Sequence, residues 1–134
     1  MTKSLVKDWM STKVITIGPE ASLTEADVTM EARRIRRLLV ISDGKLIGML
    51  SEGDMREARI RYAGVDAEHE PKVADLMSTD PITISQHFSI ALAAQTMLQA
   101  KISGLPVIDN DGHLIGVLSA SDIFRYVIEM SRGE

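Results

Sequence analysis

The hydrophobic and polar positions of the chain first predict three short strands. Residues 14–17 are rich in β-branched side chains, a composition typical of a strand. Residues 38–42 form a run that is apolar up to Ser42, and residues 46–50 form another after Asp43-Gly44, a pair that favours a tight turn. We therefore expect one strand and, later in the chain, a hairpin of two more.

Two helices are predicted around this hairpin. Ser22 and Glu25 have the spacing of a capping box, so a helix should begin there and end within residues 33–37. Directly after the hairpin, residues 51–62 should form a second helix that Gly64 stops. The predicted order of elements is β-α-β-β-α.

This order occurs twice in the chain. Residues 8–17 closely match residues 75–84, and residues 43–51 match residues 111–119. Such self-similarity indicates two copies of one structural unit. The second copy predicts a strand at residues 82–84, a helix at 89–100, a hairpin over 105–118 and a helix at 119–130.

The two copies should need each other to fold. The polar, aperiodic residues 63–72 predict a linker, so we place the first repeat at residues 1–66 and the second at residues 67–134. A unit of roughly 60 residues buries only about 60% of its surface and is marginal alone. We expect an α+β fold in which a pseudo-two-fold axis relates the repeats. Their sheets should pack against each other, with the helices outside and clefts where the sheets meet.

Composition narrows the class of protein. The 134 residues are 45% hydrophobic and 25% charged, which is typical of a globular domain. The net charge of −4 argues against a general nucleic-acid binder or a protein of membrane surfaces. The chain has no cysteine, which excludes disulfides and thiolate chemistry. With no export signal and no apolar run of membrane length, we expect a cytoplasmic protein with no membrane partner.

Three motifs now indicate a family. Met-Ser-Thr-x-x-Ile-Thr-Ile begins at Met10 and again at Met77, residues 104–109 read Gly-Leu-Pro-Val-Ile-Asp, and residues 116–122 read Gly-Val-Leu-Ser-Ala-Ser-Asp. In this order, and over nearly the whole chain, they resemble a tandem cystathionine-β-synthase (CBS) domain pair, also called a Bateman module.

The resemblance implies a stand-alone, non-catalytic sensor. Such modules bind adenosine-containing ligands, such as AMP, ADP, ATP or S-adenosylmethionine, in clefts between the repeats. The resemblance implies no required cofactor, a homodimer, and action on a separate effector protein that the sequence does not identify. The alternative is a purely dimerisation or assembly module whose nucleotide pockets are vestigial.

Serines and aspartates at the start of each repeat's last helix are the first candidates for a nucleotide site. Alone, Ser-x-x-Asp is most often an N-cap pattern. A helix start also offers N–H groups to a phosphate, and the resemblance implies that the serine binds phosphate and the aspartate binds ribose. We expect these acids to be exposed, so that Asp122→Ala should leave the fold largely intact. These candidates are Ser51, Asp54, Ser119, Ser121 and Asp122.

A second group of candidates should surround the adenine. The resemblance implies that the base lies against the first strand of each repeat and the segment from Gly104 to Pro106. For the two isoleucines of those strands, core packing is an equal alternative. Pro106 should begin its strand, and Arg37 and Leu39 replace Gly104 and Pro106 in the first repeat, so the two sites need not be equivalent. The strand candidates are Thr12, Ile15, Thr79 and Ile82.

An arginine cluster occurs in the first repeat only. Arg33, Arg34, Arg36 and Arg37 lie where cations oppose the dipole of a helix C-terminus, which is a sufficient reason for their presence. The functional alternative is that Arg36 and Arg37 bind a phosphate through their planar donor groups. This cluster is the single feature that would support nucleic-acid binding, which the acidic composition otherwise makes unlikely.

Other chemistry finds no support in the sequence. His69, His87 and His113 lack metal-ligand spacing and should lie on the surface, and no catalytic motif is present. The last helix of each repeat carries more apolar residues than a single pair should bury, which supports the homodimer. These residues are Met55, Ile60, Tyr62, Ile123, Phe124, Tyr126, Val127, Ile128 and Met130.

Overall fold

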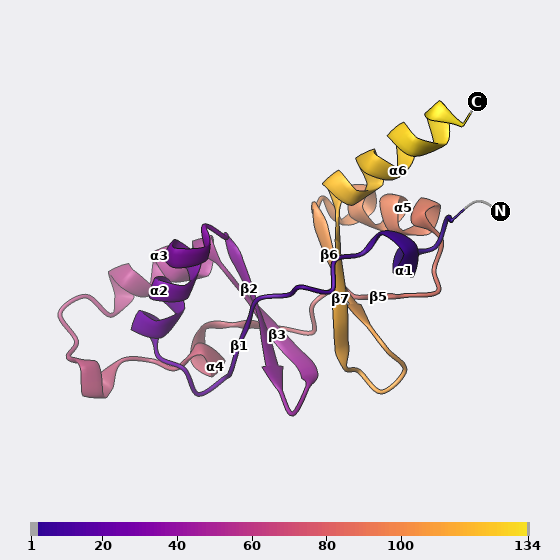
Figure 1. Ribbon diagram of the computed structural model, residues 1–134. Coiled ribbons are helices and arrows are strands. Elements are labelled where there is room, and N and C mark those ends of the chain that lie inside the picture. The colour runs from indigo at the N-terminus through magenta and orange to yellow at the C-terminus, as the bar shows by residue number, and fades with distance from the viewer. Residues whose placement is uncertain (1–2, 134) are drawn as a thin grey trace. The chain divides into compact units, whose positions relative to one another are not determined.

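The computed structural model describes residues 3–133 and has an α+β fold (Figure 1). The described residues form two compact units, and each is described by itself. The first-repeat unit spans residues 15–81, whereas the second-repeat unit combines the segment up to Val14 with the chain from Ile82 onward. The units therefore do not divide the chain where the sequence repeats divide it.

The first-repeat unit has a four-stranded sheet in the order β1-β2-β3-β4. Strands β1 and β2 are parallel, and the other neighbours are antiparallel. Helices α2 and α3 pack against each other, and α2 also packs against β2. Its elements are β1 (Thr16–Ile17), α2 (Leu23–Arg33), β2 (Arg37–Ser42), β3 (Lys45–Ser51), α3 (Glu52–Arg61), the 3-10 turn η1 (Ala67–His69), α4 (Val73–Leu76) and β4 (Ser78–Thr79).

The second-repeat unit has a three-stranded sheet in the order β5-β6-β7. Strand β5 is parallel to β6, and β6 and β7 form the predicted hairpin. Helices α5 and α6 pack against each other, as Figure 1 shows. Its elements are α1 (Val6–Trp9), β5 (Ile84–Ser85), α5 (Ile90–Ala100), β6 (Gly104–Ile108), β7 (Leu114–Ser119) and α6 (Ala120–Arg132).

Each unit has its own aliphatic core. In the first-repeat unit, Leu38, Val40, Leu50 and Met55 are completely buried, together with Val73 of α4. In the second-repeat unit, the largest fully buried residues are Val6, Leu105, Val107 and Leu118. One fully buried side chain of each core, Val73 or Val6, thus comes from a four-residue helix.

These short helices are exchanged between the repeats. Helix α1 opens the first repeat but is fixed to the second-repeat unit by hydrogen bonds from the amides of Val6 and Lys7 to the carbonyls of Phe88 and Gln86, at 2.8 and 2.9 Å. Helix α4 opens the second repeat but is fixed to the first-repeat unit, where Val73 N–H donates to the Ala21 carbonyl at 2.8 Å. In Figure 1 the indigo start of the chain accordingly runs beside β7 and α5.

The strand that opens each repeat is shorter than predicted. Strand β1 begins at Thr16 and β5 at Ile84, so residues 12–15 and 79–82 do not begin these strands. Thr79 instead belongs to β4, which pairs with β3 of the first repeat. Both differences arise because the Met-Ser-Thr segments pair with the far edge of a hairpin before the chain reaches the opening strand.

The helices agree with the prediction to within two residues at each end. Helix α2 ends at Arg33, and Arg34 closes it in a left-handed conformation with φ of 55°. Helix α6 continues to Arg132 rather than Met130. Within residues 3–133, no helix combines the length and the apolar character that crossing a membrane requires.

Candidate functional site

Ser51 and Asp54 form a reciprocal cap at the start of α3. Strand β3 ends where the helix begins, and Ser51 Oγ accepts a hydrogen bond from the Asp54 amide at 3.1 Å. The Asp54 carboxylate accepts one from the Ser51 amide at 2.9 Å. The pair therefore satisfies two of the amides that a helix start leaves unpaired. Both side chains are half-buried, so a ligand can still reach them.

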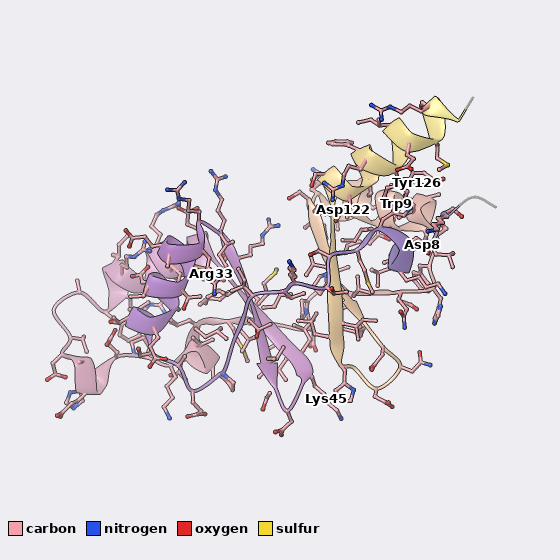
Figure 2. The ribbon with its side chains drawn as sticks, in the orientation of Figure 1. Asp8, Trp9, Arg33, Lys45, Asp122 and Tyr126 are labelled. Carbon is pink, nitrogen blue, oxygen red and sulfur yellow. The ribbon has the colours of Figure 1, made fainter. Side chains whose placement is uncertain are left out.

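Ser119 and Asp122 repeat this arrangement at the start of α6, where Figure 2 labels Asp122. Oδ2 of Asp122 accepts hydrogen bonds from the amide and the hydroxyl of Ser119 at 2.7 and 2.9 Å. The Ser121 hydroxyl lies 2.8 Å from the Ser119 hydroxyl. The other carboxylate oxygen of Asp122 pairs with Arg125. All three of the proposed polar groups of the second repeat thus meet at one helix start.

Asp122 is buried, and the expectation of an exposed acid is wrong for this position. Only 3% of the residue is accessible, because the turn of α6, the end of β7 and the Arg125 side chain enclose it. Removing a buried, hydrogen-bonded carboxylate leaves its partners unsatisfied, typically at a cost of about 1–3 kcal/mol. Asp122→Ala should therefore destabilise the fold, contrary to the expectation from sequence.

Arg125 is a site residue that the sequence analysis missed. It follows Asp122 by three positions on α6, and that spacing places two side chains on one face of a helix. This spacing is the signal that could have found it. The first repeat has Glu57 at the equivalent position, and Glu57 pairs with Arg61 instead. The charge beside the two aspartates is therefore opposite in the two repeats.

The strand opposite each serine carries the next candidates. Arg37 is the register partner of Ser51, and Gly104 is the register partner of Ser119. Residues 67 positions apart thus occupy equivalent places in the two units but differ chemically. Arg37 is exposed at the start of β2, and Arg36 precedes it with its Nε 3.8 Å from Glu52. Two arginines and a glutamate surround the helix start of the first repeat.

Pro106 lies third in β6, not at the start of the strand as predicted. Its register partner is Val117, whose amide and carbonyl both bond to Ser11 at 2.9 Å. Val117 therefore directs its backbone groups away from β6, and Pro106 occupies a pair that exchanges no hydrogen bonds. The missing N–H of this buried proline consequently costs no bond between β6 and β7.

Each structural unit contains one opening-strand candidate from each sequence repeat. Thr12 follows Ser11 into the second-repeat unit, whereas Thr79 pairs with Gly48 in the first-repeat unit. Ile15 packs against the core of the first-repeat unit, and Ile82 belongs to the second-repeat unit with 48% of its surface exposed. Core packing thus accounts for Ile15, whereas Ile82 is available to a ligand.

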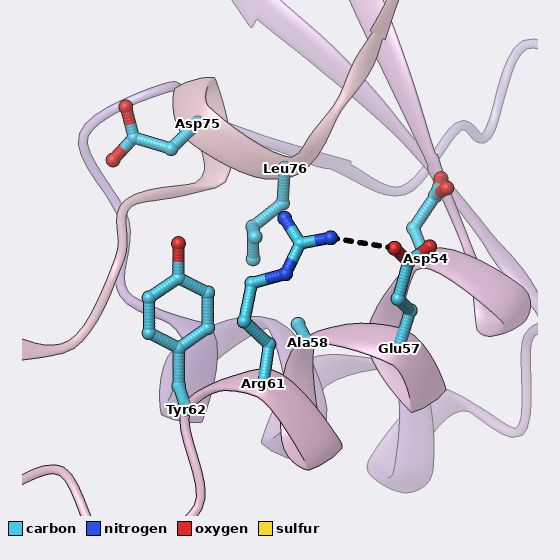
Figure 3. A pocket seen from close by; sticks show the side chains of 7 residues that line it. All are labelled: Asp54, Glu57, Ala58, Arg61, Tyr62, Asp75 and Leu76. Carbon is cyan, nitrogen blue, oxygen red and sulfur yellow. Dashed lines mark hydrogen bonds and ion pairs between the residues drawn. The ribbon is translucent and has the colours of Figure 1, made fainter.

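A small pocket of about 80 Å³ lies beside Asp54 in the first-repeat unit (Figure 3). Figure 3 shows the Arg61 side chain near Leu76, directed toward Glu57. At the equivalent place in the second-repeat unit, Trp9 and Tyr126 form an edge-to-face pair 5.6 Å apart. The pocket is present where the first-repeat unit has Leu76 and Ala58 in place of these two aromatic residues.

The three histidines belong to turns and exposed segments. His69 and His87 are exposed, and half-buried His113 lies in a hairpin with Asp109 and Asp111. Oδ1 of Asp109 accepts hydrogen bonds from the amides of His113 and Asp111, both at 2.9 Å. These bonds, the one from His113 first, lower the pKa of Asp109 below its ordinary value. The hairpin turn accounts for this cluster without a metal.

Two α/β repeats with matching serine–aspartate helix starts define a tandem-repeat module, and comparison identifies its family. The CBS domain family matches residues 6–61 and again residues 73–129. This chain therefore belongs to the CBS domain family. A CBS domain-containing protein of Dictyostelium discoideum is 32% identical over 142 residues, covering 96% of this chain and 94% of its own length. One from Bacillus subtilis is 30% identical over 90% of this chain and 83% of its own length.

Solved structures of CBS pairs have the same fold. The crystal structure of CBSX2 in complex with AMP has a TM-score of 0.83 and 26% identity, and covers 96% of this chain and 98% of that one. The CBS domain pair of protein MJ0100, in complex with 5-methylthioadenosine and S-adenosyl-L-methionine, has a TM-score of 0.76 and 26% identity, and covers 95% and 98%. Both similar proteins hold adenosine-containing ligands.

Some similar proteins are enzymes, but this chain matches only a small part of them. Inosine-5'-monophosphate dehydrogenase of Thermoplasma acidophilum is 32% identical over 82% of this chain, which is 21% of that enzyme. The similarity therefore concerns their CBS portion.

Proposed function

We propose that this chain is a non-catalytic regulatory module that binds an adenosine-containing ligand, one of AMP, ADP, ATP or S-adenosylmethionine. The ligand would act as a regulatory signal, and the module would assemble as a homodimer and act on a separate effector protein. The position of the ligand between the two repeats, implied by the family resemblance, stays a prediction.

The observation that carries this proposal is the paired helix start. Ser51 with Asp54 and Ser119 with Asp122 each place a hydroxyl and a carboxylate at the first turn of a helix. Such a turn has partial positive charge and suits a phosphate, and a carboxylate accepts hydrogen bonds from ribose hydroxyls. The AMP complex of CBSX2 and the S-adenosylmethionine complex of MJ0100 support the same ligand class.

The two helix starts should differ in ligand preference. Asp54 has its capping bond from Ser51, whose register partner is Arg37, and Arg36 pairs with Glu52 in the same helix start; two arginines suit a ligand with several phosphates. Asp122 is already paired with Arg125, so a ribose must share this carboxylate or displace the arginine. We therefore expect tighter nucleotide binding through Asp54 than through Asp122.

The alternative is an assembly module with vestigial pockets, and one observation favours it. Both carboxylate oxygens of Asp122 are engaged within the first turn of α6, by Ser119 and by Arg125. A cap and an ion pair thus explain this acid without a ligand.

Calorimetric titration of the whole chain with AMP, ATP and S-adenosylmethionine separates the two proposals. If the chain is a sensor, at least one ligand should give saturable heat. This heat should be lost or weakened in Asp54→Asn. The far-ultraviolet circular dichroism spectrum of that variant should match the spectrum of the parent chain, which shows that the variant is folded. Asp66→Asn is a control, because Asp66 likewise accepts a backbone amide bond at a helix start, that of the exposed turn η1. A folded chain that gives no heat at millimolar ligand would leave the assembly module as the function.

A further inference from the structure

The helix starts of the two units share their serine and aspartate but differ at two positions close to the aspartate. In the second-repeat unit these positions hold Ser121 and Arg125. The first repeat has Gly53 and Glu57 there, 68 residues earlier. A hydroxyl and a guanidinium donate hydrogen bonds, whereas glycine has no side chain and an ionised carboxylate only accepts. The second-repeat unit thus adds two donors to a motif that both repeats share.

Arg125 and Asp122 form an ion pair in which one partner is buried and the other is accessible. The Asp122 side chain is 5% exposed, whereas 62% of the Arg125 side chain is exposed. The buried carboxylate is also fixed by the amide and the hydroxyl of Ser119, at 2.7 and 2.9 Å. Arg125 can therefore leave the pair by a rotation of its own side chain, while the acid stays in place.

This ion pair raises the cost of binding a ribose at Asp122. A ligand that offers Arg125 no new partner bears the whole cost of opening the pair, because apparent affinity falls with the fraction of sites that are open. A ligand with a phosphate offers Arg125 a second anion, and phosphate oxygens accept the same parallel N–H bonds as a carboxylate. The cost of opening the site therefore depends on the charge of the ligand.

We propose that Arg125 makes the second-repeat unit selective for nucleotides that carry a phosphate, such as AMP, over the uncharged nucleoside adenosine. This inference rests on the proposed function and specifies the ligand class at one of its two helix starts. When the nucleotide binds, Arg125 moves from Asp122 to the phosphate. The exposed Ser121 hydroxyl, 2.8 Å from that of Ser119, donates to the same phosphate. Arg125 is thus a specificity-determining residue, because it obstructs the ligand that cannot engage it.

The first-repeat unit lacks this arrangement. Glu57 pairs with Arg61 one turn further along α3. The Asp54 carboxylate accepts its bond from the Ser51 amide, and among the described residues no cation forms an ion pair with it. A ribose at Asp54 therefore breaks no ion pair. A variant that removes the Asp54 carboxylate consequently leaves the selective helix start for measurement.

Calorimetric titration with AMP and with adenosine tests the selectivity in a whole chain that carries Asp54→Asn. Asparagine retains an acceptor for the Ser51 amide but no charge, so the remaining heat reports binding through Asp122. In this background Arg125→Gln should weaken AMP binding by about tenfold or more, because a bond to a charged group is lost. Adenosine should bind as tightly as before or more tightly, since an uncharged amide is displaced from Asp122 more easily than a guanidinium.

Two further variants in the same background serve as comparisons. Arg132→Gln makes the same change at an exposed position in the last turn of α6 and should alter neither affinity. Arg125→Lys keeps the positive charge and should retain a preference for AMP. The glutamine of Arg125→Gln can still donate to buried Asp122, which protects the fold, and unfolding midpoints close to that of the Asp54→Asn chain show that each variant is folded.

Opposite responses to the two ligands distinguish selection from a structural role, because loss of a structural contact weakens both ligands together. Equal weakening of AMP and adenosine, or an unchanged preference in Arg125→Gln, would overturn the proposal. So would an Asp54→Asn chain that binds adenosine as tightly as AMP, or one that gives no heat with either. In the last case the parent chain decides the proposed function: heat with AMP retains that function and refutes only this inference, whereas no heat with any of its ligands refutes both.

Discussion

At the residue scale, the serines that cap α3 and α6 combine this structural task with the proposed ligand contact, and one substitution cannot separate the two. Ser51 Oγ accepts from the Asp54 amide, yet its hydroxyl hydrogen remains available to a phosphate oxygen. The cap and the proposed ligand contact would thus use different parts of the same group. A substitution at Ser51 should affect stability and affinity together, so a cap with no ligand role is needed for comparison.

Ser22 provides that comparison. Its Oγ accepts from the Glu25 amide at 3.1 Å, the same distance as in the Ser51 cap, and it begins α2 in the same unit. We expect Ser22→Ala and Ser51→Ala each to lower the free energy of unfolding by about 1 kcal/mol. Only Ser51→Ala should weaken nucleotide binding, by about tenfold for one lost hydrogen bond to a charged group.

Chemical denaturation and calorimetry on the two variants measure both quantities. Equal affinity of the two variants for AMP would show that Ser51 is a cap and nothing more. A loss of affinity in Ser22→Ala as large as in Ser51→Ala would indicate that the ligand responds to the stability of the unit rather than to the serine.

The sequence could predict the helix starts but not their surroundings. Ser-x-x-Asp after an apolar run is a local pattern, and both predicted caps are present. The burial of Asp122 depends on Arg125 and on packing against β7, and neither is contained in the four-residue pattern. Opposite charges at the equivalent positions, Arg125 and Glu57, make the two starts different although their motifs agree.

At the element scale, exchange of the short segments α1 and α4 is the feature that sequence could not predict. Met10-Ser11-Thr12 and Met77-Ser78-Thr79 are identical, and both target hairpins have glycine at the contact, Gly116 and Gly48. Local sequence therefore cannot specify which hairpin each segment joins. Four-residue helices are also too short to form without tertiary contacts, so propensity gives no signal for them.

Glycine permits the close approach of each exchanged segment. A Cβ added to Gly116 would lie 2.8 Å from both Met10 Sδ and the Ser11 carbonyl oxygen, and one added to Gly48 would lie 2.8 Å from the Ser78 carbonyl oxygen. Backbone oxygen cannot move away as a flexible side chain can, so the segment must shift. Steric overlap of this kind typically costs about 1–3 kcal/mol.

Gly116→Ala should therefore loosen the segment that carries α1. We expect faster hydrogen exchange at the amides of Ser11 and Val117, which bond to each other's carbonyls at 2.9 Å, and a lower unfolding midpoint. Gly18→Ala is the control, because an added Cβ there meets nothing within 4 Å. Unchanged protection of Ser11 and Val117 in Gly116→Ala would contradict the close approach.

At the scale of the whole molecule, the exchange determines which piece of the chain can fold. The core of the first-repeat unit includes Val73, fully buried, with Leu76 and Met77 packed against it. All three lie beyond the sequence repeat that ends at residue 66. A fragment of residues 15–81 contains this whole core, whereas a fragment of residues 1–66 lacks the three and carries Val6, which belongs to the other core.

The two fragments have nearly equal length, so their comparison isolates the exchanged segment. Burying one large aliphatic side chain contributes about 1.5–3 kcal/mol, and a domain of this size has only about 3–5 kcal/mol in total. Loss of Val73, Leu76 and Met77 should therefore leave fragment 1–66 unfolded, while fragment 15–81 shows a cooperative thermal transition and dispersed amide resonances. Adding a peptide of residues 67–81 to fragment 1–66 should restore the transition, because it supplies α4 and β4. If fragment 1–66 alone unfolds as cooperatively as fragment 15–81, the short helix α4 is dispensable and the sequence repeat is itself the folding unit.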